Sequence, residues 1–245
     1  ILVTLTTIII FWEKLKHRDS FTHFFKKPIQ GVGIIAHHKD DSAFSLEYYK
    51  QEFPSYGTTD FRKPAVKILQ ENGSRITDFK YDSHKIISGK PKVEGLPSTY
   101  VESSNEATTL EIKLIDSVLD CELYLTYTIY ENRAVITRNS RLENKGNQKL
   151  IIENLMSTSI DFPDYDYQMI HLSGAWGRER HIKTRNLEKG CQYIDSTRGS
   201  SSAHQNPFVA LKRKNTNEHS GEVFGFSLVY SGNFLAHIEV DHFDS

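Results

Sequence analysis

Apolar and polar side chains alternate with a period of two residues through most of this chain. Leu110 and Ile112 share one face of such a segment, and Glu111 and Lys113 share the other. A half-buried β-strand requires this alternation. No apolar stripe with helical spacing extends over three turns, and only residues 17–26 favour a short helix. The pattern therefore predicts an all-β fold with few short helices.

Turn signals divide the alternating pattern into many strands. Asn-Gly at 72–73, Asn-Lys-Gly at 144–146 and Ser-Gly at 231–232 each place a residue that tolerates positive φ between β runs. The thirteen residues 118–130 are long for one strand, so we expect a bend or bulge there. Many strands joined by hairpins predict a large antiparallel two-sheet β-sandwich. The expected strands are residues 66–70, 75–81, 110–114, 118–130, 133–141, 149–155, 168–172, 208–213, 222–230 and 234–240, and the expected loops are residues 27–45, 91–104, 161–166 and 184–207.

Composition excludes several classes of function. The 30 basic and 31 acidic residues give a net charge of −1, without the basic footprint of a nucleic-acid-binding protein. Residues 1–12 are apolar but too short to span a bilayer, and they favour a buried strand over a signal peptide. The two cysteines, Cys121 and Cys191, cannot form a disulfide framework, so we expect a cytoplasmic location. Since the sequence begins with Ile1 and ends without a turn, we expect truncation at both ends.

Two acidic or histidine-rich segments are candidate metal or catalytic sites. Asp161, Asp164 and Asp166 lie close together, as in a Ca²⁺ site, and the adjacent His37 and His38 could bind a transition metal. However, aspartate before proline is ordinary turn chemistry, and a glycosidase needs carboxyl groups on two separate supports roughly 5–9 Å apart. We therefore favour a solvated turn and a polar loop, and we predict no metal and no cofactor. Glycine-rich phosphate loops and the GxSxG hydrolase motif are absent.

The segment 172–181 places one tryptophan between two glycines. Gly174 and Gly177 flank Trp176, and glycine allows a sharp turn and a close approach to a ligand. An indole presents a flat apolar face and one donor, which suits the C–H face of a pyranose, and the charged residues 178–180 add hydrogen bonding. Taken alone, these residues favour a core tryptophan beside a salt-bridged strand, with the sugar-binding indole as the alternative.

At this segment the sequence resembles the N-terminal domain of bacterial α-galactosidases of glycoside hydrolase family 36. Several long motifs occur in the right order over nearly the whole chain, which makes the resemblance specific. These motifs are QEFPSYGTTDFR at 51–62, GLPSTYVE at 95–102, LSGAWGRERH at 172–181, RGSSS at 198–202, HQNPF at 204–208, and residues 221–241 with the core GFSLVYSGNFLA.

The resemblance implies a fold, an activity and a division of labour. Residues 1–245 would form one N-terminal β-supersandwich domain, with the catalytic (β/α)₈ barrel and a C-terminal β domain outside it. The enzyme would hydrolyse terminal α-galactosyl residues of melibiose or raffinose with retention of configuration. Both catalytic aspartates belong to the barrel, so this chain holds no catalytic residue and alone should be inactive, because a barrel needs about 250 residues of its own.

The resemblance also assigns two residues to the sugar pocket. Trp176 matches the tryptophan that the N-terminal domain contributes to that pocket. In tetrameric members, a loop of the neighbouring subunit places an aspartate near the galactose. The corresponding loop here is residues 27–45, and Gln30 takes the place of the aspartate, without its charge. The implied partners are α-galactoside oligosaccharides, the chain's own barrel and further subunits of a tetramer, with no nucleic acid and no membrane.

Two other classes of function stay open from the sequence. A stand-alone carbohydrate-binding β-sandwich would share the fold and the exposed indole, and the sequence downstream of residue 245 would distinguish it. A structural interaction module would use the edge strands of a large sandwich, and a fully buried Trp176 would favour it.

Overall fold

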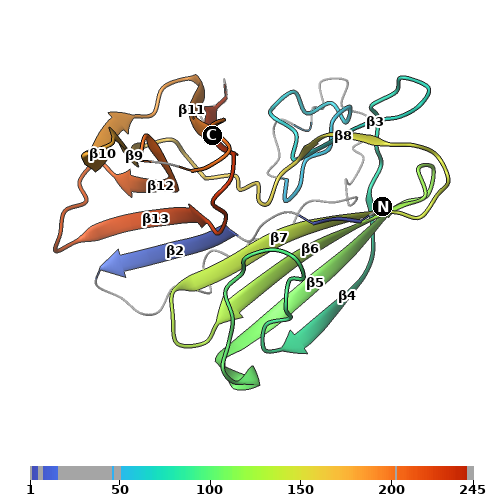
Figure 1. The fold of residues 1–245 in the computed structure, drawn as a ribbon, viewed down its shortest axis with the longest axis horizontal. Helices are drawn as coiled ribbons and strands as arrows, with labels where there is room; N and C mark the ends of the chain where they lie inside the picture. The colour runs from blue at the N-terminus through green and yellow to red at the C-terminus, as the bar shows by residue number, and fades with distance from the viewer. Residues whose placement is uncertain (1, 5–7, 16–45, 47–50, 202, 242–245) are drawn as a thin grey trace, which may run out of the picture.

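The structure is a computed structural model that describes residues 2–4, 8–15, 46, 51–201 and 203–241, with only the backbone of residues 2–4 and 8–15. One antiparallel sheet of ten strands dominates it, in the order β10-β9-β12-β13-β2-β7-β6-β5-β4, with β1 also paired to β7 (Figure 1). Its strands are β1 (Leu2–Thr4), β2 (Ile8–Leu15), β4 (Lys80–Ser88), β5 (Ala107–Asp116), β6 (Cys121–Tyr130), β7 (Val135–Asn144), β9 (Tyr167–Ala175), β10 (Arg178–Asn186), β12 (Gln205–Arg213) and β13 (Gly221–Leu228).

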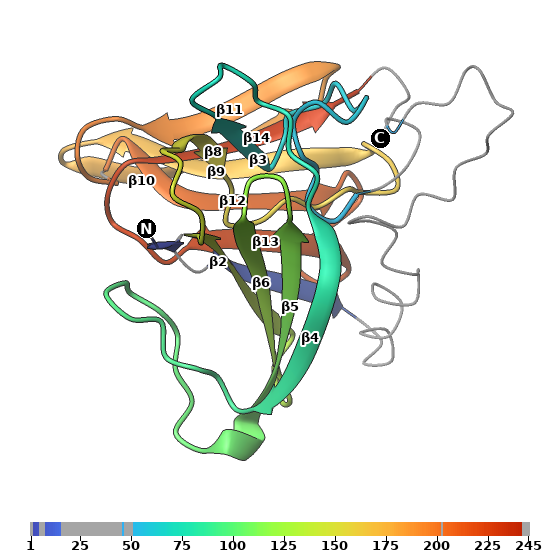
Figure 2. The same ribbon diagram turned by 90° about the vertical axis from the view of Figure 1, so that its right-hand side faces the viewer.

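Two small antiparallel sheets form the second layer. The pair β3 (Val66–Leu69) and β8 (Ile151–Leu155) lies over the half of the large sheet that contains β4 to β7, and the pair β11 (Gly190–Ser196) and β14 (Phe234–Val240) lies over the other half (Figure 1). The view in Figure 2 shows the strands of the two halves running at a large angle to each other. The all-β sandwich is confirmed, and its second layer is divided in two.

Each half of the sandwich has its own apolar core, because inward side chains of the large sheet meet a small sheet. In the first core, Leu123 and Leu125 of β6 pack with Val66 and Ile68 of β3. The second core contains Tyr167 and Met169 of β9, Leu211 of β12, Phe224 of β13, Ile194 of β11 and Phe234 of β14. The alternation in the sequence therefore marks the inward faces correctly.

The structure differs from the sequence-based expectation most clearly in three segments. The strand expected at residues 75–81 is β4, which spans Lys80–Ser88. The segment 184–207, expected to be a loop, contains the end of β10, all of β11 and the start of β12. The long strand expected at 118–130 starts at Cys121 and keeps a regular register with both neighbours, so it has no bulge.

Weak alternation of apolar and polar residues explains the errors at β4 and β10. β4 and β10 are the two edge strands of the large sheet, and nearly all of their residues are exposed. A strand that buries little on either face carries no apolar alternation to detect. Before β6, Asp120 adopts a positive φ of 53° and closes a turn, because the Asp side chain tolerates this conformation. The expected helix at residues 17–26 lies outside the described residues.

The described residues contain a short 3-10 helix, η2 (Ser104–Glu106), and no helix among them has the length and apolarity needed to cross a membrane.

Candidate functional site

Trp176 lies at the tip of the hairpin that joins β9 to β10. Ala175 pairs with Arg178 across the turn, so Trp176 and Gly177 are its two central residues. Gly177 has a φ of +78°, which an L side chain rarely adopts, and this explains why glycine occupies the position. The indole is 92% exposed, so the core tryptophan favoured by the residues alone is wrong.

The hairpin is tightly packed at Gly174, two residues before Trp176. A Cβ atom at this position would lie 2.2 Å from the carbonyl oxygen of Arg178. The backbone N–H of Gly174 also donates a hydrogen bond of 3.2 Å to the carbonyl oxygen of His204, directly before β12. The two strands therefore approach each other closely beside the turn, and β12 holds the hairpin on its other side.

An exposed indole on such a hairpin can bind an apolar face of a ligand. β10 is exposed along its whole length, and Arg178 and Arg180 stand beside the turn. An aromatic side chain in water leaves a large apolar area unburied, and exposed aromatics of this kind commonly mark contact sites. The site presents one flat apolar surface with charged side chains close to it.

The second residue assigned to the pocket, Gln30, lies outside the described residues, as do the loop 27–45 and the pair His37 and His38.

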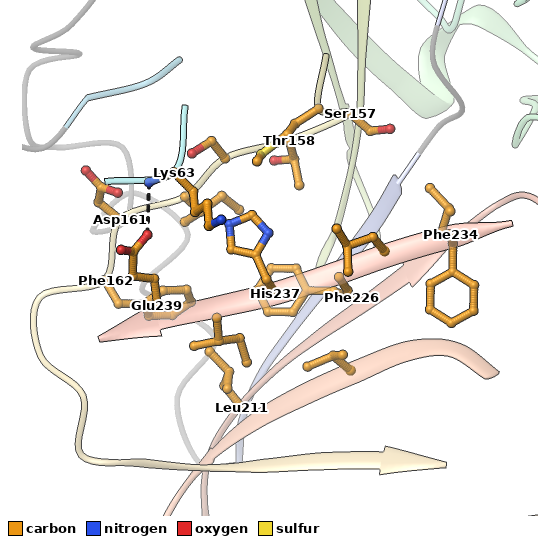
Figure 3. Close-up of a pocket in the computed structure, with 18 of the residues that line it drawn as sticks. Lys63, Ser157, Thr158, Asp161, Phe162, Leu211, Phe226, Phe234, His237 and Glu239 are labelled. Carbon is orange, nitrogen blue, oxygen red and sulfur yellow. Dashed lines mark hydrogen bonds between the residues drawn. The ribbon is translucent and has the colours of Figure 1, made fainter. Parts of the chain in front are cut away.

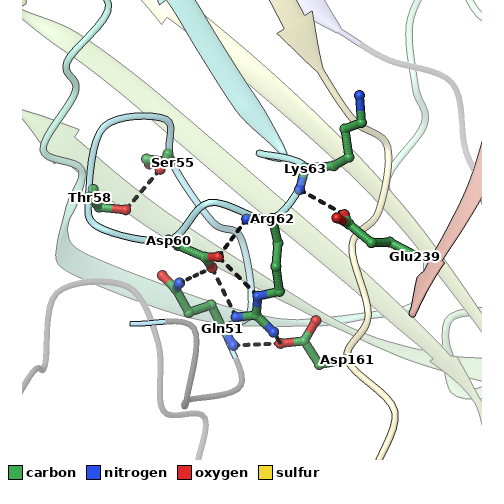
Figure 4. Close-up of polar contacts among 8 residues, drawn as sticks. All are labelled: Gln51, Ser55, Thr58, Asp60, Arg62, Lys63, Asp161 and Glu239. Carbon is green, nitrogen blue, oxygen red and sulfur yellow. Dashed lines mark hydrogen bonds and ion pairs between the residues drawn. The ribbon is translucent and has the colours of Figure 1, made fainter. Parts of the chain in front are cut away.

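The three aspartates of residues 161–166 pair with three different cations. Asp161 accepts hydrogen bonds from the backbone N–H of Gln51 and from Arg62 (Figure 4), while Asp164 pairs with Arg213 and Asp166 with Lys214. The side chain of Asp161 is only 22% exposed, so the expected solvated turn is wrong at this residue. Across the part of the chain that the structure describes, no group of three or more His, Cys, Asp or Glu side chains could hold a metal ion.

Arg62 is the centre of a polar network that joins the motif at residues 51–62 to the connection before β9 (Figure 4). It bonds Asp60 through its backbone N–H, Nε and Nη2, and Asp161 through Nη1. Burial lowers the pKa of its guanidinium, but the hydrogen bonds and charges of the two aspartates outweigh burial and raise it. The network therefore has a structural role, which the sequence motif alone does not distinguish from a functional one.

A cavity of about 630 Å³ lies between β14 and the inner face of β12 and β13 (Figure 3). Leu211, Phe226 and Phe234 form part of its apolar lining, and His237 points into it. Burial lowers the pKa of the His237 imidazole. Trp176 does not line this cavity, so the exposed indole and the internal space are separate features.

The two cysteines are free, as the sequence predicts. Cys121 is buried on β6 and Cys191 is partly buried on β11. Burial raises the pKa of the Cys121 thiol to about 11, so this thiol is unreactive at neutral pH.

The sequence indicated hydrogen bonding by residues 178–180 but not that Glu179 would bond the turn backbone itself. Its Oε1 atom accepts a hydrogen bond of 2.8 Å from the backbone N–H of Gly177. An acidic residue two positions after a turn glycine is too common a pattern to predict this particular bond.

Comparisons with known proteins agree with the fold. The chain matches the glycosyl hydrolase family 36 N-terminal domain over residues 14–245. It is 56% identical over 203 residues to α-galactosidase AgaA of Geobacillus stearothermophilus, and 39% identical over 203 residues to α-galactosidase Mel36A of Lactobacillus acidophilus. In both cases the match covers 83% of this chain and 28% of the relative.

A solved structure matches almost the whole chain. The crystal structure of an AgaA variant in complex with raffinose aligns with a TM-score of 0.83 and 51% identity, over 93% of this chain and 32% of that chain. This chain thus spans 28% to 32% of the length of these three relatives.

Proposed function

Because this chain is a glycosyl hydrolase family 36 N-terminal domain, we propose that it is the N-terminal domain of a retaining α-galactosidase. The substrates would be terminal α-galactosides of the melibiose and raffinose type. Crystal structures of the related AgaA in complex with raffinose and with stachyose support this substrate class. The observation that carries the proposal is the exposed Trp176 on a hairpin that its glycines and β12 hold in place.

In this proposal, Trp176 forms one wall of the sugar pocket and the catalytic barrel of the same polypeptide forms the rest. The 92% exposure of the indole supports this role, since a large aromatic face is available to a ligand or to another domain. Stacking on the C–H face of galactose would remove that face from water. The contact would stabilise bound substrate by about 1–3 kcal/mol, in the range of other buried aromatic contacts.

The chain itself would supply no catalytic carboxylate. Retaining glycosidases need two carboxyl groups about 5–5.5 Å apart on opposite sides of the scissile bond. The three clustered aspartates each pair with a cation instead. We therefore propose that the chain alone does not hydrolyse α-galactosides, and that detectable turnover lost on mutation of Asp161, Asp164 or Asp166 would contradict this division.

The assembly and location are further parts of the proposal. Subunits would associate as a homo-oligomer, a tetramer in the family's arrangement, and the loop with Gln30 would reach a neighbouring pocket. A cytoplasmic location is supported by the two free cysteines, which suit a reducing compartment.

The test is steady-state kinetics of the complete enzyme with raffinose. Trp176→Ala should lower kcat/KM by roughly 5- to 150-fold, the equivalent of 1–3 kcal/mol, and Trp176→Phe should recover part of the loss. Tyr100→Ala is the matched control, since Tyr100 is 77% exposed but lies in the loop before η2. Unchanged kcat and KM in Trp176→Ala would refute the role of the indole.

A further inference from the structure

We propose that Glu179 is the positioning residue for Trp176. Its carboxylate holds the turn in one conformation, so that the indole projects in the orientation that the substrate needs. This inference rests on the proposed function of Trp176 and adds a second residue to the same site.

The contact that carries the inference is the hydrogen bond from the Gly177 backbone N–H to Oε1 of Glu179, 2.8 Å long. Gly177 directly follows Trp176, and its φ of +78° belongs to a region that glycine enters and leaves freely. A glycine turn without a further restraint would sample several conformations, and fixing it would cost conformational entropy when substrate binds. A carboxylate that binds this N–H removes part of that freedom before substrate arrives.

A β-bulge brings Glu179 into reach of the turn. The register of the hairpin shifts between Arg178 and His181: three steps along β10 match two steps along β9, from Ala175 to Ser173. The extra residue disturbs the alternation of side chains at residues 178–181. Arg180 absorbs the change with a φ of 58°, a conformation that residues other than glycine rarely adopt.

The remainder of the hairpin leaves the turn little other freedom. Gly174 allows the Arg178 carbonyl to approach closely, and the N–H of Gly174 bonds the carbonyl of His204. These contacts fix the strand directly before the turn, while the bond to Glu179 restrains the turn itself. Among the hydrogen bonds of the described residues, the bond to Glu179 is the one that joins a side chain to the backbone of the turn.

Charge also points to this role for Glu179. Arg178 and Arg180 flank it in the sequence, yet no ion pair joins them to it in the described part of the chain, where the carboxylate bonds the turn. Removal of this side chain should therefore loosen the turn without breaking a surface ion pair.

The experiment compares five variants of the complete enzyme with raffinose as substrate: Glu179→Ala, Glu179→Gln, Trp176→Ala, the double variant, and Glu188→Ala. Glu188 is an exposed glutamate in the β10–β11 connection and is the matched control. Glu179→Ala should raise KM about three- to tenfold, since displacing a binding group by a fraction of an ångström costs affinity. The KM of Glu179→Gln should stay within about twofold of the value for the unchanged enzyme, because its amide oxygen accepts the same hydrogen bond. Glu188→Ala should match the unchanged enzyme.

The double variant tests whether Glu179 acts through Trp176. The KM of the double variant should equal that of Trp176→Ala alone, because the loss of the positioning residue has no further effect once the indole is removed. A further loss in the double variant would mean that Glu179 contacts substrate or another residue directly, and would overturn the inference. Hydrogen exchange gives a readout separate from activity: the Gly177 amide should exchange faster in Glu179→Ala at unchanged Tm.

The outcomes separate the two proposals. If Trp176→Ala weakens the enzyme but Glu179→Ala changes neither KM nor the exchange of Gly177, the positioning role is wrong and the role of Trp176 stands. If Trp176→Ala has no effect, the proposed function of the indole fails, and the positioning role fails with it.

Discussion

The Nη1 atom of Arg62 lies 3.3 Å from Oδ2 of Asp161, a residue 99 positions later in the chain. The same guanidinium bonds Asp60, whose side chain is 1% exposed (Figure 4). Arg62 therefore ties the turn before β3 to the connection between β8 and β9, which runs from one half of the sandwich to the other.

Arg62→Ala should destabilise the fold by about 3 kcal/mol, because it leaves the buried carboxylate of Asp60 without its cation. The midpoint of urea unfolding measures this effect. Arg75→Ala is the matched control: Arg75 forms a two-pronged pair with Glu153 at the surface, and its loss should shift the midpoint much less. Equal shifts for the two variants would contradict the structural role of the buried network.

Thr109 and Thr128 form a buried hydroxyl pair with unequal roles. Thr109 donates its single proton to the carbonyl oxygen of Gly89, so the hydroxyl of Thr128 donates to Thr109. Thr109→Val loses both bonds and should cost roughly 2 kcal/mol, while Thr128→Val loses one and should cost roughly 1 kcal/mol. Thermal unfolding of both variants measures how much stability each one loses. A greater loss of stability in Thr128→Val than in Thr109→Val would contradict this assignment of the donors.

His237 should make stability depend on pH near neutrality. Burial lowers its pKa in the folded state, and the charge of Lys63 adds to this effect, whereas Glu239 opposes it. The unfolded imidazole takes up a proton near pH 6.5. The stabilisation is thus fully present above pH 6.5 and is lost as the pH falls from there through the lowered folded pKa.

His237→Gln should reduce the fall in unfolding free energy between pH 7.5 and pH 5.5. A part of the fall should persist, because burial also lowers the pKa of His171. An identical fall in the variant and the unchanged chain would show that His237 does not titrate differently in the folded state.

The two thiols should differ in reactivity. The pKa of Cys121 is raised to about 11 by burial, with the charge of Asp116 adding to the effect, so almost none of this thiol is ionised at pH 8. Iodoacetamide at pH 8 should modify Cys191 well before Cys121, as peptide mass spectrometry can measure. Equal modification of the folded chain at both residues would contradict the burial of Cys121.

The sequence predicted the fold class and most inward-facing positions, because a strand that buries one face shows a clear alternation of apolar and polar residues. Leu123 and Leu125 of β6 are examples, and both lie in the first core. The edge strands β4 and β10 could not be predicted in the same way, since they bury little and their position depends on hydrogen bonding to a neighbour. The division of the second layer into two sheets depends on contacts between residues far apart in the sequence.

The candidate site was predicted in part. The glycines around Trp176 indicated the sharp turn that the structure shows, whereas the assignment of this tryptophan to a sugar pocket by the family resemblance stays a prediction. The exposure of Trp176 follows from its place at the hairpin tip. The contact of Glu179 with the turn lies beside a bulge in β10, where Arg180 carries no sequence signal for its positive φ. Asp161 was assigned to a solvated turn because its cation, Arg62, lies 99 residues earlier.

The most direct test of the proposed place of Trp176 in the sugar pocket is oxidative footprinting of this residue in the complete enzyme. Hydroxyl radicals should oxidise Trp176 rapidly in the isolated chain, where the indole is 92% exposed. In the complete enzyme, saturation with 1-deoxygalactonojirimycin, the ligand in one related AgaA structure, should slow its oxidation at least severalfold, since a sugar ring would cover the indole. Oxidation of Tyr100 should not change. Equal oxidation of Trp176 with and without the ligand would contradict the claim that this indole forms a wall of the sugar pocket.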